Sequence, residues 1–86
     1  RGAGRGKSSM IPPLTLYTRA GCHLCEQAED LLALHAPSCE LVDVDANEEA
    51  RGLYGLRVPV LARGGRVLLE GGIGERELII ALASSP

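Results

Sequence analysis

The segment from Leu14 to Pro37 changes its hydrophobic period once, and this change constrains the fold more than any other feature. Residues 14–18 alternate as in a strand, and Gly21 ends that pattern. From Cys22 onward a helical spacing follows, with acidic residues on the other side, until Pro37 stops it. The positions at helical spacing are Leu24, Ala28, Leu31, Leu32 and His35. A strand that runs directly into a helix predicts an α/β domain.

The rest of the chain predicts a mixed sheet. After the first strand and helix, the expected elements are a strand at 40–44, a helix at 48–54, a strand at 59–63, a strand at 67–70 and a helix at 75–83. Gly64-Gly65 is a two-residue hairpin turn between the last two strands. The order βαβαββα predicts a four-stranded mixed sheet flanked by helices.

The length of 86 residues predicts one folded domain. Residues 1–10 are rich in Gly and basic residues, and we expect a disordered N-terminal tail there, with the domain at 11–86. The chain has no Trp and no Phe, so its core must consist of Leu, Val, Ile and Ala.

Charge and hydropathy exclude several classes of function. The first nine residues carry three of the nine basic residues and no acid, so the remainder has six basic and 11 acidic side chains. A domain this acidic is a poor binder of nucleic acid. We find no membrane-spanning run and no secretory signal pattern, and three cysteines do not suit a disulfide-stapled scaffold. We therefore expect a monomeric cytoplasmic protein with no nucleic-acid or membrane partner.

The residues Cys22-His23-Leu24-Cys25 carry the chemistry that the sequence predicts. Cys22 lies where a strand ends and a helix begins, and the free N–H groups of a first helical turn favour an anion such as a thiolate. Cys25 is one turn along, so it can attack a mixed disulfide formed at Cys22. The other interpretation is that both cysteines are small buried hydrophobes.

A zinc site built from Cys22, Cys25, His35 and Cys39 is the alternative chemistry. A helix places His35 roughly 15 Å beyond Cys25, which is too far for a shared ion, so we expect no metal. His23 either stabilises the Cys22 thiolate as an imidazolium or is an exposed polar residue. We expect His35 to cap the end of its helix and Cys39 to be structural.

Three segments resemble the glutaredoxins in order and spacing. Residues 16–25 resemble the first strand and active site of that family, residues 54–61 resemble its Tyr-Gly-x-x-x-Val-Pro segment, and Gly71-Gly72 matches the Gly-Gly before its last helix. The resemblance spans about residues 13–83 and is closest to the short glutaredoxin-like proteins of bacteria. It implies a thioredoxin/glutaredoxin fold and a thiol–disulfide oxidoreductase with Cys22 and Cys25 as catalytic residues.

The resemblance also implies a substrate-binding edge. The residue matching Pro59 is cis in the family, and Val58 would pair with the cysteinyl backbone of a bound thiol. Arg19 matches a basic residue that faces a glutathione carboxylate, and Arg57 could add a second contact of that kind. In glutathione-dependent members of the family, Gly-Gly is usually followed by a small residue or Cys and then by an Asp that binds the γ-glutamyl end of glutathione. Here Ile73-Gly74-Glu75 follows, so the carboxylate lies one position later.

The sequence therefore predicts a redox protein without a tightly bound cofactor, with glutathione as a candidate co-substrate. Its partners would be a disulfide-containing protein or glutathione, and the electron donor would be glutathione or a thioredoxin reductase-like protein. The alternative is a non-catalytic thioredoxin-fold module that docks a peptide or partner protein at the Val58-Pro59 edge.

Overall fold

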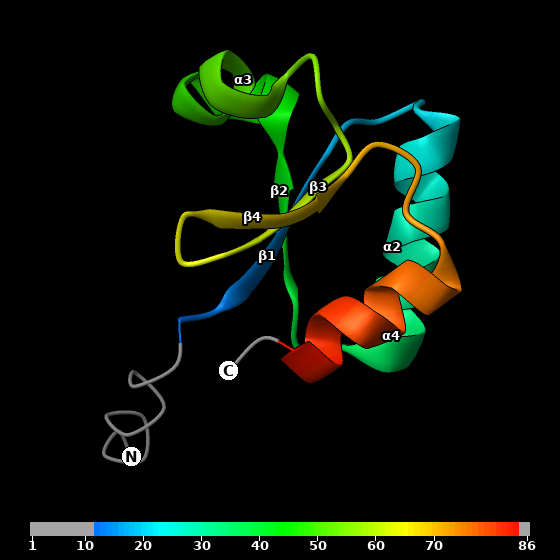
Figure 1. Ribbon diagram of the computed structural model, residues 1–86. Helices are drawn as coiled ribbons and strands as arrows, with labels where there is room; N and C mark the ends of the chain where they lie inside the picture. Colours follow the sequence, from blue (N-terminus) through cyan, green and yellow to red (C-terminus); the bar gives the residue numbers. More distant parts are fainter. Residues whose placement is uncertain (1–11, 85–86) are drawn as a thin grey trace, which may run out of the picture.

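Residues 12–84 are described by the computed structural model, and they contain the predicted strands and α-helices in the predicted order (Figure 1). The predicted disordered tail at 1–10 lies outside these residues. Within 12–84 no helix combines the length and hydropathy that crossing a membrane requires.

The elements have the following bounds. They are β1 (Leu14–Thr18), α2 (His23–His35), β2 (Glu40–Asp43), the short 3₁₀ helix η1 (Val44–Ala46), α3 (Glu48–Tyr54), β3 (Val60–Arg63), β4 (Arg66–Glu70) and α4 (Glu75–Ser84). The main difference from expectation is at Val44, which was expected in a strand but begins η1. The Asp43 carboxylate accepts a hydrogen bond of 2.9 Å from the Asp45 N–H, and this side-chain cap bends the chain there.

The sheet has the order β2-β1-β3-β4. β1 pairs with β2 in parallel, which requires the crossover that α2 provides, and with β3 in antiparallel. β3 and β4 form the predicted hairpin, in which Gly64 and Gly65 both have positive φ, +59° and +86°. Two positive φ angles are what a type I′ turn requires, so the prediction of this turn is confirmed.

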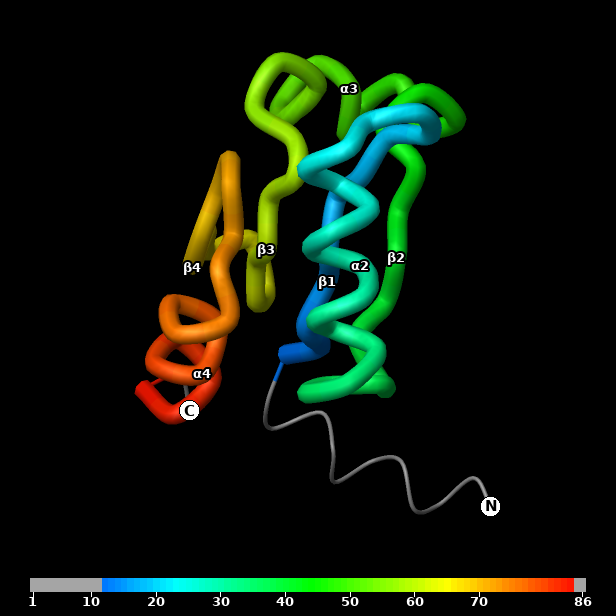
Figure 2. The backbone as a smooth tube through the Cα atoms, turned by 90° about the vertical axis from the view of Figure 1, so that its right-hand side faces the viewer, coloured from blue at the N-terminus to red at the C-terminus, as the bar shows by residue number. Residues whose placement is uncertain are grey.

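The two faces of the sheet carry separate apolar clusters. α2 and α4 lie side by side over one face, as Figures 1 and 2 show, and α3 lies over one end of the other face. The cluster under α2 and α4 contains Leu14, Leu16, Ala28, Leu32, Leu61, Ile73 and Leu78. The smaller cluster under α3 contains Val44, Ala50, Tyr54 and Val60. Every second residue of β1 is therefore buried, as the alternation predicts.

The buried face of α2 differs from the predicted one at its start. Cys25, Ala28 and Leu32 are buried, whereas Leu24 is 44% exposed. At about 100° per residue, Cys25 lies about 40° from the centre of the face formed by Ala28 and Leu32, and Leu24 lies about 60° from it on the other side, so Cys25 is closer to the core. The Cys22–Cys25 segment thus contributes Cys25 to the core and leaves Leu24 at the surface.

Candidate active site

Cys22 is the N-cap residue of α2. Its backbone is extended, and its sulfur accepts a hydrogen bond of 3.3 Å from the Cys25 N–H. Its carbonyl oxygen accepts the first helical bond, from the Glu26 N–H at 2.9 Å. The preceding residue, Gly21, has a φ of +76°, a backbone conformation that residues other than Gly rarely adopt. The glycine and the cap together direct a partly exposed sulfur at the free N–H groups of the first turn.

Cys25 has a different environment, although it is only three residues away. Its side chain is fully buried, and burial, together with its hydrogen bond to Cys22, raises the pKa of the Cys25 thiol. The neighbouring Thr18 hydroxyl and Arg19 backbone act in the opposite direction on this pKa. Neither Cys22 nor Cys25 takes part in a disulfide in the structure. The site therefore pairs an accessible thiol at a helix N-terminus with an enclosed thiol, as a two-step exchange requires.

The Val58–Pro59 peptide bond is cis. The Pro59 carbonyl oxygen accepts a hydrogen bond of 2.9 Å from the Gly71 N–H, so the segment before β3 is tied to the segment after β4. Gly72 lies next to α2, because a Cβ built on it would be 3.8 Å from Leu24. The structure thus brings the three predicted landmarks together at the end of the sheet where α2 begins (Figures 1 and 2). These landmarks are the cysteine pair, Val58-Pro59 and Gly71-Gly72.

Arg19 is held by acidic and carbonyl groups of the protein itself. Its guanidinium donates two hydrogen bonds to Asp45, at 2.9 and 3.0 Å, and one to the Gly55 carbonyl oxygen at 2.9 Å. The ion pair raises the pKa of Arg19 and lowers the pKa of Asp45, mainly through the side-chain hydrogen bond. Asp45 was not among the predicted site residues, since only the fold brings η1 beside the end of β1.

Arg57 is also paired. It donates a hydrogen bond of 2.7 Å to Glu70 at the end of β4, and its guanidinium lies 5.6 Å from the centre of the Tyr54 ring. The hydrogen bond raises the pKa of Arg57 and lowers the pKa of Glu70. Both arginines predicted to contact a ligand carboxylate therefore already contact a carboxylate of the protein.

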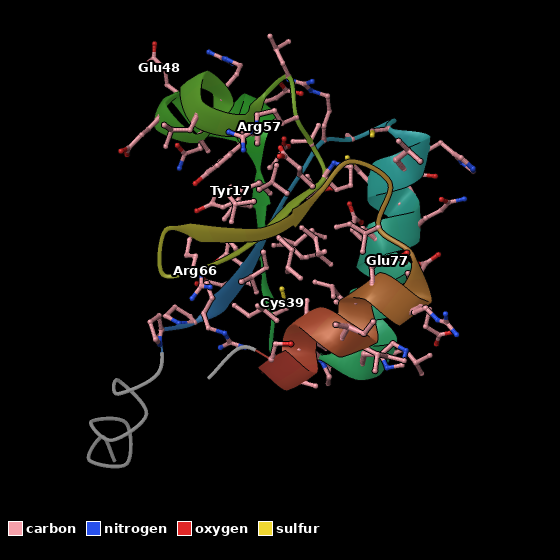
Figure 3. The ribbon with its side chains drawn as sticks, viewed as in Figure 1. Tyr17, Cys39, Glu48, Arg57, Arg66 and Glu77 are labelled. Carbon is pink, nitrogen blue, oxygen red and sulfur yellow. The ribbon has the colours of Figure 1, made fainter. Side chains whose placement is uncertain are left out.

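The remaining histidines and cysteine lie apart from one another. His23 is exposed and its Nε2 is 3.1 Å from the Gln27 amide nitrogen. His35 was expected to cap α2, but its Nε2 pairs with Glu75 at 2.7 Å and links α2 to α4. Figure 3 shows Cys39 at the opposite end of the sheet from Arg57, and burial raises the pKa of Cys39 to about 11. Among residues 12–84, no three His, Cys, Asp or Glu side chains gather into a metal-binding group.

Besides Asp45, two further residues near the cysteine pair, Thr18 and Glu29, were not predicted from the sequence. Thr18, the last residue of β1, is buried, and its hydroxyl donates a hydrogen bond of 2.5 Å to Glu29 of α2. The strand alternation places Thr18 on the inner face, and Glu29 is four residues beyond Cys25 on the same side of the helix. The alternation in β1 and the four-residue spacing from Cys25 to Glu29 could have indicated that Thr18 and Glu29 lie near Cys25. The helical pattern instead placed Glu29 on the outer, acidic face of α2.

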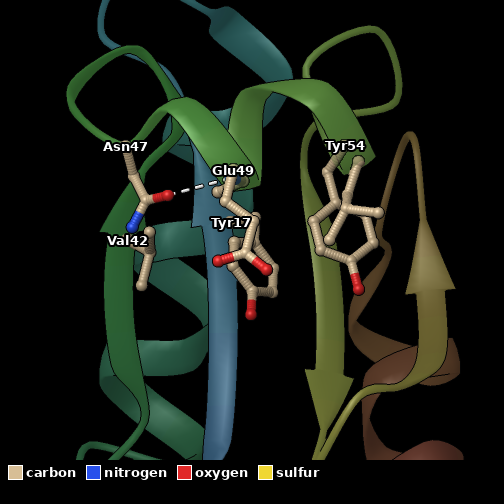
Figure 4. A pocket seen from close by; sticks show the side chains of 7 residues that line it. Tyr17, Val42, Asn47, Glu49 and Tyr54 are labelled. Atoms are coloured by element: carbon tan, nitrogen blue, oxygen red, sulfur yellow. Dashed lines mark hydrogen bonds between the residues drawn. The ribbon is translucent and has the colours of Figure 1, made fainter.

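A hollow of about 200 Å³ lies beside α3, on the face of the sheet opposite α2 and α4 (Figure 4). It is lined by Tyr17, Val42, Asn47, Glu49, Ala50, Leu53 and Tyr54. The rings of Tyr17 and Tyr54 are 4.4 Å apart there. None of the predicted site residues lines this hollow, so it is separate from the cysteine pair.

The sequence pattern of the family described as "Glutaredoxin-like domain (DUF836)" matches residues 13–82. The Gene 56 protein of Mycobacterium phage L5 is 38% identical over 58 residues, which are 62% of this chain and 56% of the phage protein. The match thus spans little more than half the length of that curated relative.

Solved structures agree with this family match. The X-ray structure of the structural genomics target protein XcR50 from X. campestris has a TM-score of 0.74 and 40% identity, covering 85% of this chain and 99% of that one. The thioredoxin of Fasciola hepatica has a TM-score of 0.57 at 22% identity, with coverages of 98% and 91%. Glutaredoxin C1 of poplar (populus tremula x tremuloides) has a TM-score of 0.53 at 19% identity, with coverages of 95% and 88%. The last two likenesses show the thioredoxin/glutaredoxin fold.

Proposed function

This chain belongs to the glutaredoxin-like domain family, and we propose that it is a thiol–disulfide oxidoreductase that uses Cys22 and Cys25. One observation carries the proposal: the Cys22 sulfur is the N-cap of α2 and accepts the Cys25 N–H at 3.3 Å. The positive end of the helix and this N–H favour the thiolate, which is the form that attacks a disulfide.

The proposed reaction has two exchange steps. The Cys22 thiolate attacks one sulfur of a client disulfide, forms a mixed disulfide and releases the other client sulfur as a thiolate. Cys25 then loses its proton and attacks the Cys22 sulfur, so the second client thiolate leaves and a Cys22–Cys25 disulfide remains. The client gains two electrons and the cysteine pair loses two. An external thiol, from glutathione or a thioredoxin reductase-like protein, returns the pair to its reduced form.

The predicted substrate-binding residues are part of this proposal. The client's cysteinyl backbone would pair with Val58 beside Pro59, next to Gly71-Gly72. Arg19 and Arg57 would offer their guanidinium groups to a carboxylate of the client or of glutathione. Their present partners lie at the surface, where exchanging one carboxylate for another costs little.

The proposal also includes His23 and a cellular compartment. The imidazolium form of His23, adjacent to Cys22 in the chain, would add to the stabilisation of the Cys22 thiolate. A pair that works as a reductant needs a reducing compartment, which for this chain we take to be the cytoplasm. No tightly bound cofactor enters either step.

The test is turnover of a mixed disulfide between glutathione and a small thiol, with either glutathione or dithiothreitol as the reductant. Cys22→Ser should abolish turnover, while Cys39→Ser, which removes a thiol at the other end of the sheet, should leave it unchanged. If Cys25→Ser retains activity with glutathione, the reaction follows a one-cysteine route through glutathione. If Cys25→Ser is inactive, both cysteines are needed.

No turnover by the reduced wild-type chain with either reductant would refute the proposal. The proposal would also fail if Cys22 reacted with an alkylating reagent no faster than a free thiol does. The alternative, a non-catalytic module that docks a partner at the Val58-Pro59 edge, predicts this pair of results.

A further inference from the structure

Arg19 joins the segment before the cysteine pair to the segment before Val58-Pro59. It follows β1 directly and precedes Cys22 by three residues. Its guanidinium donates a hydrogen bond of 2.9 Å to the Gly55 carbonyl oxygen, at the start of the segment that leads to Val58. A client disulfide that reacts at Cys22 therefore brings its own charged groups close to Arg19.

Asp45 fills one of the two edges on which Arg19 can bind a carboxylate. A guanidinium binds a carboxylate most strongly through two parallel hydrogen bonds from one of these edges. Nε and Nη2 of Arg19 make these bonds to Asp45, at 2.9 and 3.0 Å. The other edge includes Nη1, which already donates to Gly55. Three of the five N–H groups of the guanidinium are thus in use, and each of its nitrogens already has an acceptor in the protein.

The ion pair also cancels the charge that would attract a client carboxylate. Asp45 is part of the same chain as Arg19, and a tethered group competes at an effective concentration of millimolar order. A client carboxylate that displaces Asp45 gains one ion pair and gives up an equivalent one. A client carboxylate that does not displace Asp45 meets a neutral pair. The excess of acidic over basic residues beyond the first nine, 11 against six, adds a field that disfavours anions.

We propose that Asp45 is a specificity-determining residue, which acts through Arg19 to select against disulfides that carry carboxylates beside the reacting sulfurs, as glutathione disulfide does. The inference rests on the proposed function and concerns only which client reacts at Cys22. A disulfide in uncharged or basic surroundings does not need a free guanidinium, so it keeps its full rate. The client class that this site favours is therefore a non-anionic disulfide.

The charge of Asp45 can be removed without removing the contacts that shape η1. Its carboxylate is hydrogen-bonded to Arg19, whereas its backbone N–H donates to Asp43 and its backbone carbonyl oxygen accepts from Arg51 at 3.4 Å. Asp45→Asn keeps an oxygen that can accept from Arg19. Glu48 is an exposed residue at the start of α3. Glu48→Gln is the matched control, because it removes the same charge three positions along the chain and leaves the Arg19–Asp45 pair in place.

The experiment compares two small disulfides that differ in charge. The reduced chain, carrying Cys39→Ser to remove the third thiol, is mixed with excess dithiodipropionate, which has two carboxylates, or with excess hydroxyethyl disulfide, which is uncharged. In each case the Cys22–Cys25 disulfide forms and two small thiols are released. Acid quenching, alkylation of the remaining thiols and mass spectrometry give the rate. The measured quantity is the ratio of the dithiodipropionate rate to the hydroxyethyl disulfide rate, because a change in the reactivity of Cys22 itself alters both rates equally.

Asp45→Asn should raise this ratio about fivefold near pH 7, which is the effect of one pair of unit charges about 4 Å apart in water. Glu48→Gln should change the ratio by less than about twofold, because salt at about 0.15 M screens exposed charges that lie farther from the client. In an Arg19→Gln background, Asp45→Asn should likewise change it by less than about twofold, since no guanidinium is left to release. A rate with hydroxyethyl disulfide close to that of the wild type shows that a variant is folded.

The outcomes separate the inference from the proposed function. An unchanged ratio in Asp45→Asn, with normal oxidation by hydroxyethyl disulfide, would overturn the inference alone. Equal rises in Asp45→Asn and Glu48→Gln would also overturn it, because they would assign the effect to net charge. A full rise in the Arg19→Gln background would show that Asp45 does not act through Arg19. If neither disulfide oxidises the wild-type chain, the proposed function fails and the inference fails with it.

Discussion

The adjacent glycines at the candidate site, Gly71 and Gly72, should respond in opposite directions to the same substitution. Gly71 has a φ of +75°, whereas the φ of Gly72 is not in the left-handed region. An alanine forced into the left-handed region loses about 1–2 kcal/mol. Where the native conformation suits alanine, losing a glycine stabilises by about 0.4–1 kcal/mol, because the unfolded chain has less freedom.

These magnitudes combine with the space around each glycine. Nothing lies within 4 Å of a Cβ at Gly71, so only the backbone opposes Gly71→Ala. A Cβ at Gly72 makes an ordinary contact of 3.8 Å with Leu24. Gly71→Ala should therefore lower the free energy of unfolding by about 1 kcal/mol, while Gly72→Ala should leave it unchanged or raise it by up to about 1 kcal/mol. The gap in Tm should be about 5–15 °C for a domain of this size.

The assay is thermal unfolding of the reduced chain followed by circular dichroism. Gly71→Asn provides an internal check, because Asn tolerates the left-handed region better than Ala, so its Tm should lie above that of Gly71→Ala. Equal Tm values for Gly71→Ala and Gly72→Ala, or the reverse order, would show that the backbone difference does not govern this turn.

Two further predictions concern stability. Leu16→Ala truncates a fully buried side chain of β1 and should lower the free energy of unfolding, measured in urea, by about 2–5 kcal/mol. Leu34→Ala, at a side chain that is 72% exposed, should change it by no more than about 0.5 kcal/mol. Similar losses in the two variants would contradict the assigned core. Hydrogen bonds from Arg19 and Arg57 lower the pKa values of Asp45 and Glu70. The ionised carboxylates therefore stabilise the folded chain above about pH 5. This stabilisation is lost as the pH falls through the ordinary carboxyl pKa values near 4 toward the lower values of the folded state. The double variant Asp45→Asn/Glu70→Gln should therefore lose less stability than the wild type between pH 6 and pH 3 in urea unfolding, and an equal loss would contradict the pairing.

The sequence by itself determined the order of the elements and the position of the cysteine pair. Alternation from Leu14 to Thr18, the glycine at position 21 and the helical spacing beyond it are local patterns, and local geometry is enough to place Cys22 at a helix start. The Gly64-Gly65 turn is equally local, because two positive φ angles select glycine. The resemblance to the glutaredoxins rested on such landmarks, and the cis Val58–Pro59 bond that it implied is present.

Only the tertiary structure decided what surrounds those landmarks. Asp45 reaches Arg19 across 26 positions of sequence, and Glu29 reaches Thr18 across 11, so no local period could have paired them. The burial of Cys25 also depends on how α2 packs on the sheet, which turns Cys25 inward and Leu24 outward. Pairing and burial depend on which surfaces meet in space, and these contacts exist only after the sheet and helices have packed together.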